Sequence, residues 1–197
     1  MRFKSDSRKP VQPELVASSD VSRPVLTKVH LNADKSRVEV TDSYMLAVFP
    51  VELDEGDTSG PIPVDALKAS RKPPLKSQPT SIRANSHVEV RMSHGETASA
   101  PYVTMPREDG GYTFPNVDQL IPDDLASFEI GIDAAKLARL AKAMGTDVVR
   151  LRFVAGRNSE GESDPNVPSP LRPILVNPNR YGEGEPYGLL MPVRIAG

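Results

Sequence analysis

Thr41-Asp42-Ser43 is the stretch of this sequence that most resembles a catalytic group, because it places two hydroxyls beside a carboxylate. A hydroxyl nucleophile needs a general base within reach, most often a histidine. His30, His87 and His94 are scattered along strand-like and turn-like segments, and none stands beside this stretch or has a second ligand at metal-binding spacing. We therefore interpret residues 41–43 as a turn and the histidines as plain surface residues.

No other pattern supports catalysis. The sequence has no cysteine, which removes thiolate ligands, disulfides and a cysteine nucleophile. Residues 56–61 lack the lysine and the following helix of a phosphate-binding loop. We predict a protein that is not an enzyme and has no catalytic residue, metal or cofactor. A small enzyme with a site among loops 52–60 and 156–170 stays an alternative, although no residue pattern supports it.

The helix expected over residues 132–145 offers a different chemistry, a positively charged face. At about 100° per residue its apolar and basic residues form opposed stripes. The apolar stripe consists of Leu137, Leu140 and Met144, and the basic stripe of Lys136, Arg139 and Lys142. Such a basic face suits the phosphate backbone of a nucleic acid, and a solvated face without a partner is the alternative. The helix expected over residues 64–72 is also basic, which adds Lys68, Arg71 and Lys72 as candidate phosphate contacts.

The composition is that of an ordinary globular protein. Of its 197 residues, 38% are hydrophobic and 25% are charged, and the net charge is −2. Binding to nucleic acid would therefore depend on a local basic face. The sequence has neither an apolar run of transmembrane length nor a secretory signal, and with no cysteine we expect a cytoplasmic protein.

Short strands and rigid turns are expected in the first half of the chain. One short helix at most precedes them, around residues 14–19. Alternation of apolar and polar residues over residues 25–51 predicts a hairpin with one buried, apolar (dry) face, followed by a third strand that begins at Met45. Its dry face would carry Val29, Leu31, Val38 and Val40. An acidic, solvated loop is expected at residues 52–61.

A helix should follow that loop over residues 64–72, with Asp65 as its cap and Pro73 as its stop. Strands are expected at residues 81–92 and 100–106, on either side of a turn. In the second half, Asp133 should cap the helix over residues 132–145 and Gly145 should end it. After it we expect strands at residues 149–153, 171–176 and 187–195, with a flexible loop at residues 156–170.

One group of elements occurs twice. Residues 62–68 and 130–136 share the pattern Ile-x-(Val/Ile)-Asp-Ala before a helix, and residues 101–107 and 186–194 share Pro-Tyr, an apolar stretch, Met-Pro and Arg. The chain therefore contains a helix followed by three strands in two copies. We divide it into a first domain at residues 1–113, a linker at 114–126 and an abbreviated second domain at 127–197.

These residues resemble a known family. Residues 23–51 are similar to the Arg-Pro-x-Leu and Thr-Asp-x-x-x-Leu-Ala segment of the bacterial DNA polymerase III β sliding clamp. Residues 114–122 are similar to its Phe-Pro-x-Tyr-x-x-Leu-x-Pro linker, and residues 128–153, 169–176 and 187–195 to its last part. The resemblance implies an α+β fold of clamp-like modules, about one and a half of them where a family chain has three. A compact, phage-like or divergent version of the clamp fits this length.

The resemblance also implies a function that involves no catalysis, that of a DNA polymerase processivity factor that encircles or contacts duplex DNA. It further implies a homo-oligomer that binds short peptides of polymerases and other proteins. The matching peptide-pocket positions are Leu26, Thr41, Leu46, Pro115, Leu120, Leu189, Met191, Pro192, Val193, Arg194 and Ile195. Methionine and aliphatic side chains suit an adaptable apolar pocket. The alternative is a monomeric adaptor or decoy that binds such peptides without encircling DNA. The sequence leaves open whether a ring closes.

Overall fold

The computed structural model describes residues 1–4, 10–73, 80–94, 97–107, 113–121, 129–157, 161–168, 172–179 and 186–193. The chain forms two compact units, Met1–Ile121 and Pro122–Gly197, and each is described by itself. The division lies inside the segment 114–126 that the sequence marks as a linker. Among the described residues, no helix has the length and hydropathy that crossing a bilayer would require.

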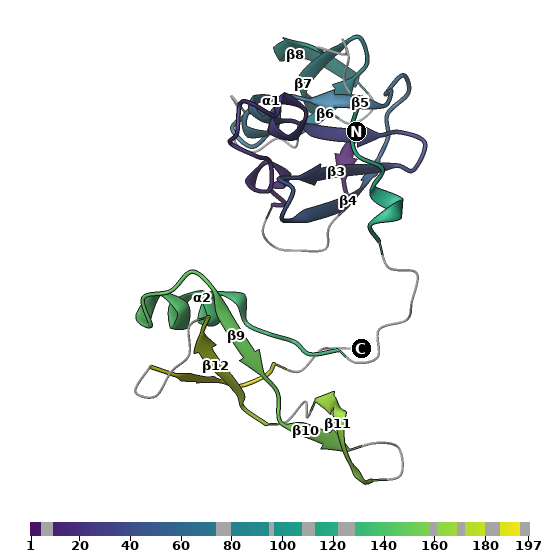
Figure 1. Cartoon of the computed structure of the whole chain (residues 1–197). Helices are drawn as coiled ribbons and strands as arrows, with labels where there is room; N and C mark the ends of the chain where they lie inside the picture. Colours follow the sequence, from purple (N-terminus) through teal and green to yellow (C-terminus); the bar gives the residue numbers. More distant parts are fainter. Residues whose placement is uncertain are drawn as a thin grey trace. The chain divides into compact units, whose positions relative to one another are not determined.

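The first unit begins with a strand, a short 3-10 turn and three antiparallel strands (Figure 1). These elements are β1 (Arg2–Phe3), η1 (Pro13–Leu15), β2 (Val29–Asn32), β3 (Arg37–Thr41) and β4 (Leu46–Glu52), with a second turn, η2 (Pro24–Thr27), before β2. The predicted hairpin and third strand are confirmed. Two boundaries were wrong: the helix over 14–19 is only the turn η1, and the first strand begins at Val29 because a proline starts η2.

The rest of the first unit repeats this order. Its elements are β5 (Gly60–Ile62), α1 (Val64–Ser70), β6 (Thr80–Ala84), β7 (His87–His94) and β8 (Thr97–Pro106). The strand predicted over 81–92 is two strands, because a turn at Asn85 and Ser86 separates β6 from β7. The turn expected between the strands at 81–92 and 100–106 belongs largely to β7 and β8. Pro63, not Asp65, is the N-cap of α1, and the helix ends at Ser70.

Two similar halves therefore make up the first unit. We call each a half-module: a pre-helix strand, a helix or its remnant, and a three-stranded antiparallel meander. Backbone hydrogen bonds join the two halves. β5 of the second half pairs with β2 of the first along three residues, and Met1, just before β1, exchanges backbone hydrogen bonds with Ile82 of β6. β1 itself pairs with β4 of its own half, so β5 is the strand that extends the sheet of the other half.

The core of the first unit draws on both halves. Val29, Leu31, Val38 and Val40 are fully buried, as the predicted dry face requires. They pack in one cluster with residues of the second half-module, among them Leu67 of α1. The buried cluster continues through Met1, Val51, Ile62, Ala66, Ile82, Ala84, Val88 and Val90. Burial of this continuous apolar surface is the main favourable term in the stability of the unit.

The second unit holds one more half-module. Its elements are α2 (Ala134–Ala143), β9 (Val149–Arg152), β10 (Ala155–Arg157), β11 (Ser163–Pro168), β12 (Ile174–Pro178) and β13 (Gly188–Leu190). The sheet order is β13-β12-β9, with α2 packed on it, and β10 and β11 form a separate hairpin (Figure 1). The Asp133 carboxylate accepts hydrogen bonds from the N–H groups of Ala135 and Lys136, and Gly145 follows the helix at φ +67°, so both predicted ends of α2 are confirmed.

Three expectations for this unit were wrong. The loop at 156–170 contains most of the β10–β11 hairpin, and the strand at 171–176 lies at Ile174–Pro178. The strand at 187–195 stops at Leu190, because Met191 and Pro192 do not pair. Val193 then forms a single bridge to Gly131, which stands just before α2. With this bridge, the order of a pre-helix strand, a helix and a meander appears for the third time, so the predicted repeat is confirmed.

Candidate functional site

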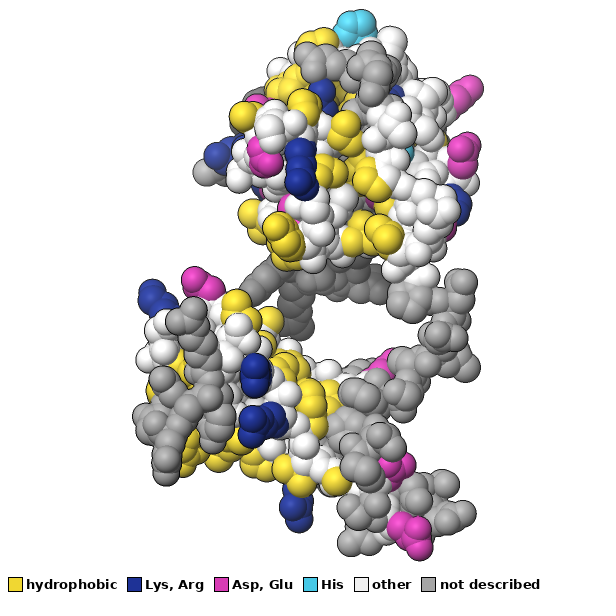
Figure 2. Space-filling view, in the orientation of Figure 1, with side chains coloured by type: hydrophobic (Ala, Val, Ile, Leu, Met, Phe, Trp, Pro, Cys, Tyr) yellow, Lys and Arg dark blue, Asp and Glu magenta, His cyan; other side chains and the backbone are white. Residues whose placement is uncertain are grey.

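Helix α2 presents the two stripes that the sequence predicts. Leu137, Leu140 and Met144 are partly buried and pack on Ile174, Val176 and Leu190 of the sheet. Lys136, Arg139 and Lys142 are exposed on the other side. In Figure 2, Lys and Arg side chains of the second unit lie among hydrophobic ones on the face shown. The sheet therefore fixes the helix through its apolar stripe and leaves the basic stripe to solvent.

The charges on α2 differ in how far they are neutralised. The Nζ atom of Lys136 lies 3.0 Å from a carboxylate oxygen of Asp133, and this contact, with the backbone N–H bonds to the same group, lowers the pKa of Asp133 below its usual value. Among the described residues, Arg139 and Lys142 have no ion-pair partner. Two full positive charges therefore remain one turn apart on the exposed face.

The basic residues of α1 are mostly neutralised. Lys68 lies 3.3 Å from the carboxylate of Asp65, and Arg71 forms an ion pair with the buried carboxylate of Glu14 in η1. Lys72 is exposed. The ion pair between Arg71 and Glu14 joins the end of α1 to the neighbouring half-module. Because Glu14 neutralises the charge of Arg71, this arginine is a weaker candidate for phosphate contact.

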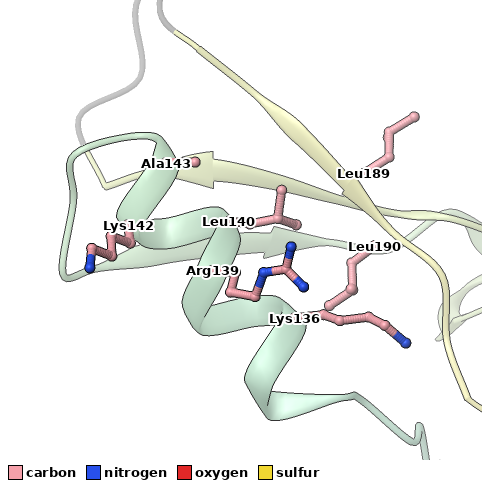
Figure 3. A pocket seen from close by; sticks show the side chains of 7 residues that line it. All are labelled: Lys136, Arg139, Leu140, Lys142, Ala143, Leu189 and Leu190. Carbon is pink, nitrogen blue, oxygen red and sulfur yellow. The ribbon is translucent and has the colours of Figure 1, made fainter.

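An open groove of about 670 Å³ lies between α2 and β13. Its lining consists of Lys136, Arg139, Leu140, Lys142, Ala143, Leu189 and Leu190 (Figure 3). Leu190 is buried against the helix, whereas Leu189 is 60% exposed and projects from β13 away from α2. Gly188 lets the strand approach closely, because a Cβ there would meet the Leu140 side chain at 3.0 Å. Apolar and basic groups thus share one groove.

This groove brings together residues that the sequence assigned to separate surfaces. The basic residues were candidates for DNA, and the leucines were candidates for the peptide pocket. Their proximity depends on pairing between β13 and β12 and on packing of α2 against both, which local sequence patterns do not specify. Beyond the groove, Met191 and Val193 are exposed and Pro192 is half-buried. Arg194 and Ile195 lie outside the described residues.

The pocket candidates of the first unit lie in three places. Thr41 and Leu46 are directly paired across β3 and β4, and the Thr41 hydroxyl donates to the Met45 carbonyl at 2.6 Å. Leu26 is buried in η2. Pro115 and Leu120, both exposed, stand on either side of the turn η3 (Val117–Gln119).

The segment around η3 is fastened to the β2–β3 hairpin. Val117 is buried, and the Asp118 carboxylate forms ion pairs with Lys35 and Arg37, which lower the pKa of Asp118. The Phe114 ring stacks on His30 with centroids 4.8 Å apart. His30 was expected to be a plain surface residue, but it is half-buried, and desolvation lowers its pKa. The first part of the predicted linker is therefore a docked element of the first unit.

The turn predicted at residues 41–43 lies at residues 42–45, because Thr41 is the last residue of β3. The Asp42 carboxylate accepts hydrogen bonds from the backbone N–H groups of Met45 and Tyr44, which lower its pKa. Ser43 adopts φ +83° at the tip and its hydroxyl accepts a hydrogen bond from Arg23. The described residues contain no group of three or more His, Asp or Glu residues that could hold a metal ion.

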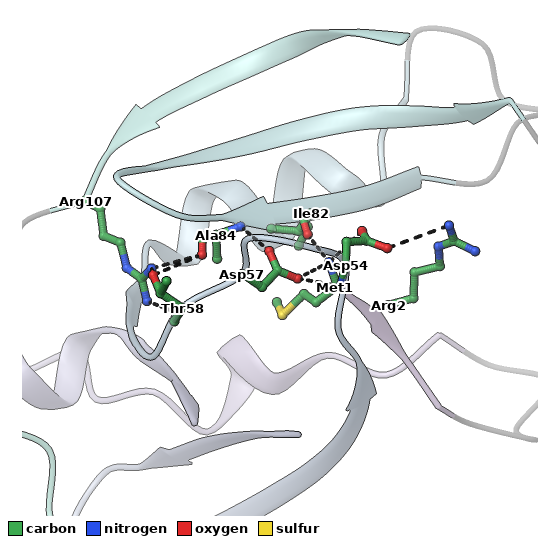
Figure 4. Close-up of polar contacts among 8 residues, drawn as sticks. All are labelled: Met1, Arg2, Asp54, Asp57, Thr58, Ile82, Ala84 and Arg107. Carbon is green, nitrogen blue, oxygen red and sulfur yellow. Dashed lines mark hydrogen bonds and ion pairs between the residues drawn. The ribbon is translucent and has the colours of Figure 1, made fainter. Parts of the chain in front are cut away.

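Two buried charges in the first unit escaped the sequence analysis (Figure 4). The loop at 52–61 was expected to be solvated, yet the Asp57 side chain is fully buried and lies 2.8 Å from the ammonium of Met1. Arg107, the arginine of the first Met-Pro repeat, is also buried and donates hydrogen bonds to Thr58, Ala84 and Asn85. The repeat of Met-Pro followed by an arginine was the only sequence pattern that singled out Arg107.

The fold is similar to solved bacterial DNA polymerase subunits. The β subunit of DNA polymerase from Streptococcus pyogenes matches with a TM-score of 0.50 and 17% identity, over 99% of this chain and 68% of that one. The DNA polymerase III β chain of Streptococcus pneumoniae matches at 0.50 and 20%, over 93% and 61%. The sliding clamp of Bacillus subtilis matches at 0.50 and 19%, over 94% and 61%. The chain has the sliding-clamp fold.

The comparison confirms the predicted class, an α+β architecture of clamp-like modules. The chain spans 61–68% of the length of these clamps. No protein-family model and no curated protein matches the sequence. The similarity to sliding clamps in these comparisons is therefore a similarity of fold.

Proposed function

We propose that this protein is a non-enzymatic, sliding-clamp-like processivity factor that contacts duplex DNA and holds partner proteins through short peptides. The observation that carries the proposal is the sliding-clamp fold with the basic stripe of α2 left to solvent. Arg139 and Lys142 are the charges best suited to phosphate contact, because they are exposed and no described residue pairs with them. The chain would act as a homo-oligomer.

A few exposed cations suit a protein that must move along DNA. Contacts between lysine or arginine and phosphates are independent of sequence, and each contact changes the logarithm of affinity by roughly −0.9 per logarithm of salt concentration. Two or three such contacts on each chain give weak binding, which salt ions readily weaken further. The duplex is then held near the helix without being fixed at one site.

The test is DNA synthesis by a partner polymerase on a long primed circular template. We expect longer products in the presence of the protein, and a loss of most of this effect in Arg139→Glu/Lys142→Glu. Lys4→Glu is the matched control, because Lys4 is an exposed lysine of the first unit. Equal product lengths with and without the parent protein would refute the proposal.

A specific observation also favours a second function, a monomeric adaptor or decoy that binds clamp-binding peptides without encircling DNA. The groove between α2 and β13 offers an apolar floor of Leu140, Ala143 and Leu190, with a basic rim. A peptide with an apolar anchor and an acidic flank would fit this chemistry. Because Leu189 is exposed, Leu189→Asp should weaken peptide binding in calorimetry without unfolding the unit.

Tyr187→Asp is the control for the peptide experiment, because Tyr187 is 68% exposed on the same segment and does not line the groove. Peptide binding that depends on Leu189 in a protein without effect on synthesis would favour the adaptor. Unchanged peptide affinity in Leu189→Asp would exclude this groove as the peptide site.

A further inference from the structure

Arg139 is a residue that both proposed partners of this chain, duplex DNA and a short peptide, would contact. It belongs to the exposed basic stripe of α2, and it also lines the groove between α2 and β13. In Figure 3 its side chain extends from the helix toward Leu190 of β13. The guanidinium therefore lies beside the apolar floor of the groove, where a phosphate or a peptide carboxylate can bind it.

Lys142 differs from Arg139 in the direction of its side chain. It follows Arg139 by about one turn of α2, and in Figure 3 it extends away from Leu189 and Leu190. A duplex that approaches the exposed face of α2 reaches both cations, because both are exposed. A peptide held against Leu190 reaches the guanidinium of Arg139 instead. The two exposed cations thus form a matched pair, with one beside the groove floor and one turned from it.

The chemistry of a guanidinium favours one anion at a time. Its N–H donors form a fixed, planar fork, and its strongest contact uses two parallel donors toward a single carboxylate or a single phosphate. A second anion at the same guanidinium loses this geometry and is repelled by the first. Among the described residues, Arg139 has no ion-pair partner that would have to be displaced. Its single strong contact is therefore available to either ligand, but not to both.

The row of charges on α2 strengthens this exclusion. Lys136, Arg139 and Lys142 are spaced three residues apart, and like charges at this spacing on a helix repel one another. Within the described part of the chain, only Lys136 has a counter-charge in this row, the Asp133 carboxylate at 3.0 Å. An anion bound at Arg139 relieves the repulsion, and the row then attracts a second anion less. A duplex and an acidic peptide thus compete through charge as well as through space.

We propose that an acidic peptide in the groove and duplex DNA on α2 exclude each other at Arg139, so that docking of a partner weakens the hold of this chain on DNA. The inference rests on the proposed function, because it requires both the DNA contact and the peptide. The peptide has leucines as its anchor and acidic residues on either side. These residues match the floor of Leu140, Ala143 and Leu190 and the basic rim. A chain with a docked partner keeps the Lys142 contact and moves along the duplex with weaker attachment.

The size of the effect follows from the loss of one phosphate contact. Each contact contributes about −0.9 to the slope of the logarithm of DNA affinity against the logarithm of salt concentration. With saturating peptide, the slope should therefore be smaller in magnitude by about 1. At about 0.1 M salt, the same loss weakens DNA affinity about five- to ten-fold. Thermodynamic linkage then requires duplex DNA to weaken peptide binding by the same factor.

Fluorescence anisotropy of the full chain with a labelled short duplex measures this coupling. The probe is a synthetic peptide with central leucines between pairs of glutamates, and the control peptide has glutamines in place of the glutamates. We expect the glutamate peptide to weaken DNA binding by the factor given above and the glutamine peptide to have little effect. The reverse titration, with labelled peptide and unlabelled duplex, should give the same factor. Equal displacement by the two peptides would overturn the assignment of the coupling to Arg139.

Arg139→Gln and Lys142→Gln are the matched variants that locate the coupling. Each removes one exposed charge from α2, so each should weaken DNA binding by a similar factor. Arg139→Gln should also weaken binding of the glutamate peptide about ten-fold, and the peptide should no longer affect DNA binding. Lys142→Gln should keep the parental peptide affinity and the coupling. Arg150→Gln is the control and should change neither affinity, because its neighbours Val149 and Leu151 face α2 and its side chain lies on the other face of β9.

The outcomes distinguish this inference from the proposed function. Binding of duplex and glutamate peptide with independent affinities, or coupling that survives in Arg139→Gln, would overturn the inference and leave the proposed function standing. A glutamate peptide that does not bind would overturn the inference as well, and the effect on DNA synthesis would still test the proposed function. A chain that binds no duplex DNA and has no effect on synthesis would remove both.

Discussion

Asp57 is the residue whose substitution most directly tests how the two halves of the first unit are joined. Its buried carboxylate accepts hydrogen bonds from the N–H groups of Ala84 at 2.8 Å and Asp54 at 2.9 Å, and it lies 2.8 Å from the ammonium of Met1 (Figure 4). Asp57→Asn keeps the shape but removes the negative charge. It also replaces one acceptor oxygen by a donor that faces other donors.

The structure sets the magnitude. Breaking a buried ion pair by removing one partner costs about 3–5 kcal/mol, because the other charge stays buried. The total stability of a domain is about 5–15 kcal/mol, so Asp57→Asn should remove a large share of it. The ammonium keeps a second contact, 2.9 Å from Asp54, which places the expected loss near 3 kcal/mol.

Urea unfolding followed by amide NMR signals measures this loss, because signals of the two units can be read separately. Signals of Val38 and Val90 report the first unit, and Val176 reports the second. Asp54→Asn is the matched control: it faces the same ammonium but its side chain is 34% exposed, so we expect less than about 1 kcal/mol. Equal losses in the two variants would refute the reasoning from burial.

Three further predictions concern the first unit. Gly60→Ala should cost about 2–4 kcal/mol in urea unfolding, because Gly60 has φ +140° and a Cβ would stand 2.6 Å from the Arg107 guanidinium; a parental midpoint would contradict this. Burial lowers the pKa of His30, so the unfolded state binds more protons. Stability should be full above about pH 6.5 and fall toward the folded pKa. An NMR titration that gives a higher value, or leaves Phe114 unmoved, would contradict it. The ion pairs of Asp118 lower its pKa and hold η3 in place. Asp118→Asn should therefore speed hydrogen exchange of the η3 amides at pH 7, and acid below about pH 4 should do the same in the parent protein. Unchanged exchange would refute this.

Local patterns predicted the elements whose signals lie within a few residues. The hairpin around Val29 and Val40 follows from alternation, and α2 follows from its cap, its stripes and its terminal glycine. The turn between β6 and β7 was missed for a definite reason. Ile82, Ala84 and Val88 are all buried, and a two-residue turn keeps the same even spacing as an uninterrupted strand.

The sites depend more on contacts between distant segments. Nothing around Asp57 marks it as buried, because its partners come from Met1 and from β6. The groove beside α2 forms only when β13 pairs with β12. The sequence around the basic residues of α2 therefore does not indicate that the leucines of β13 lie next to them, and the sequence around the leucines does not indicate the basic residues. The resemblance to the sliding clamp predicted the fold where residue spacing could not. A family resemblance implies which distant segments pair with one another, and spacing within one segment does not.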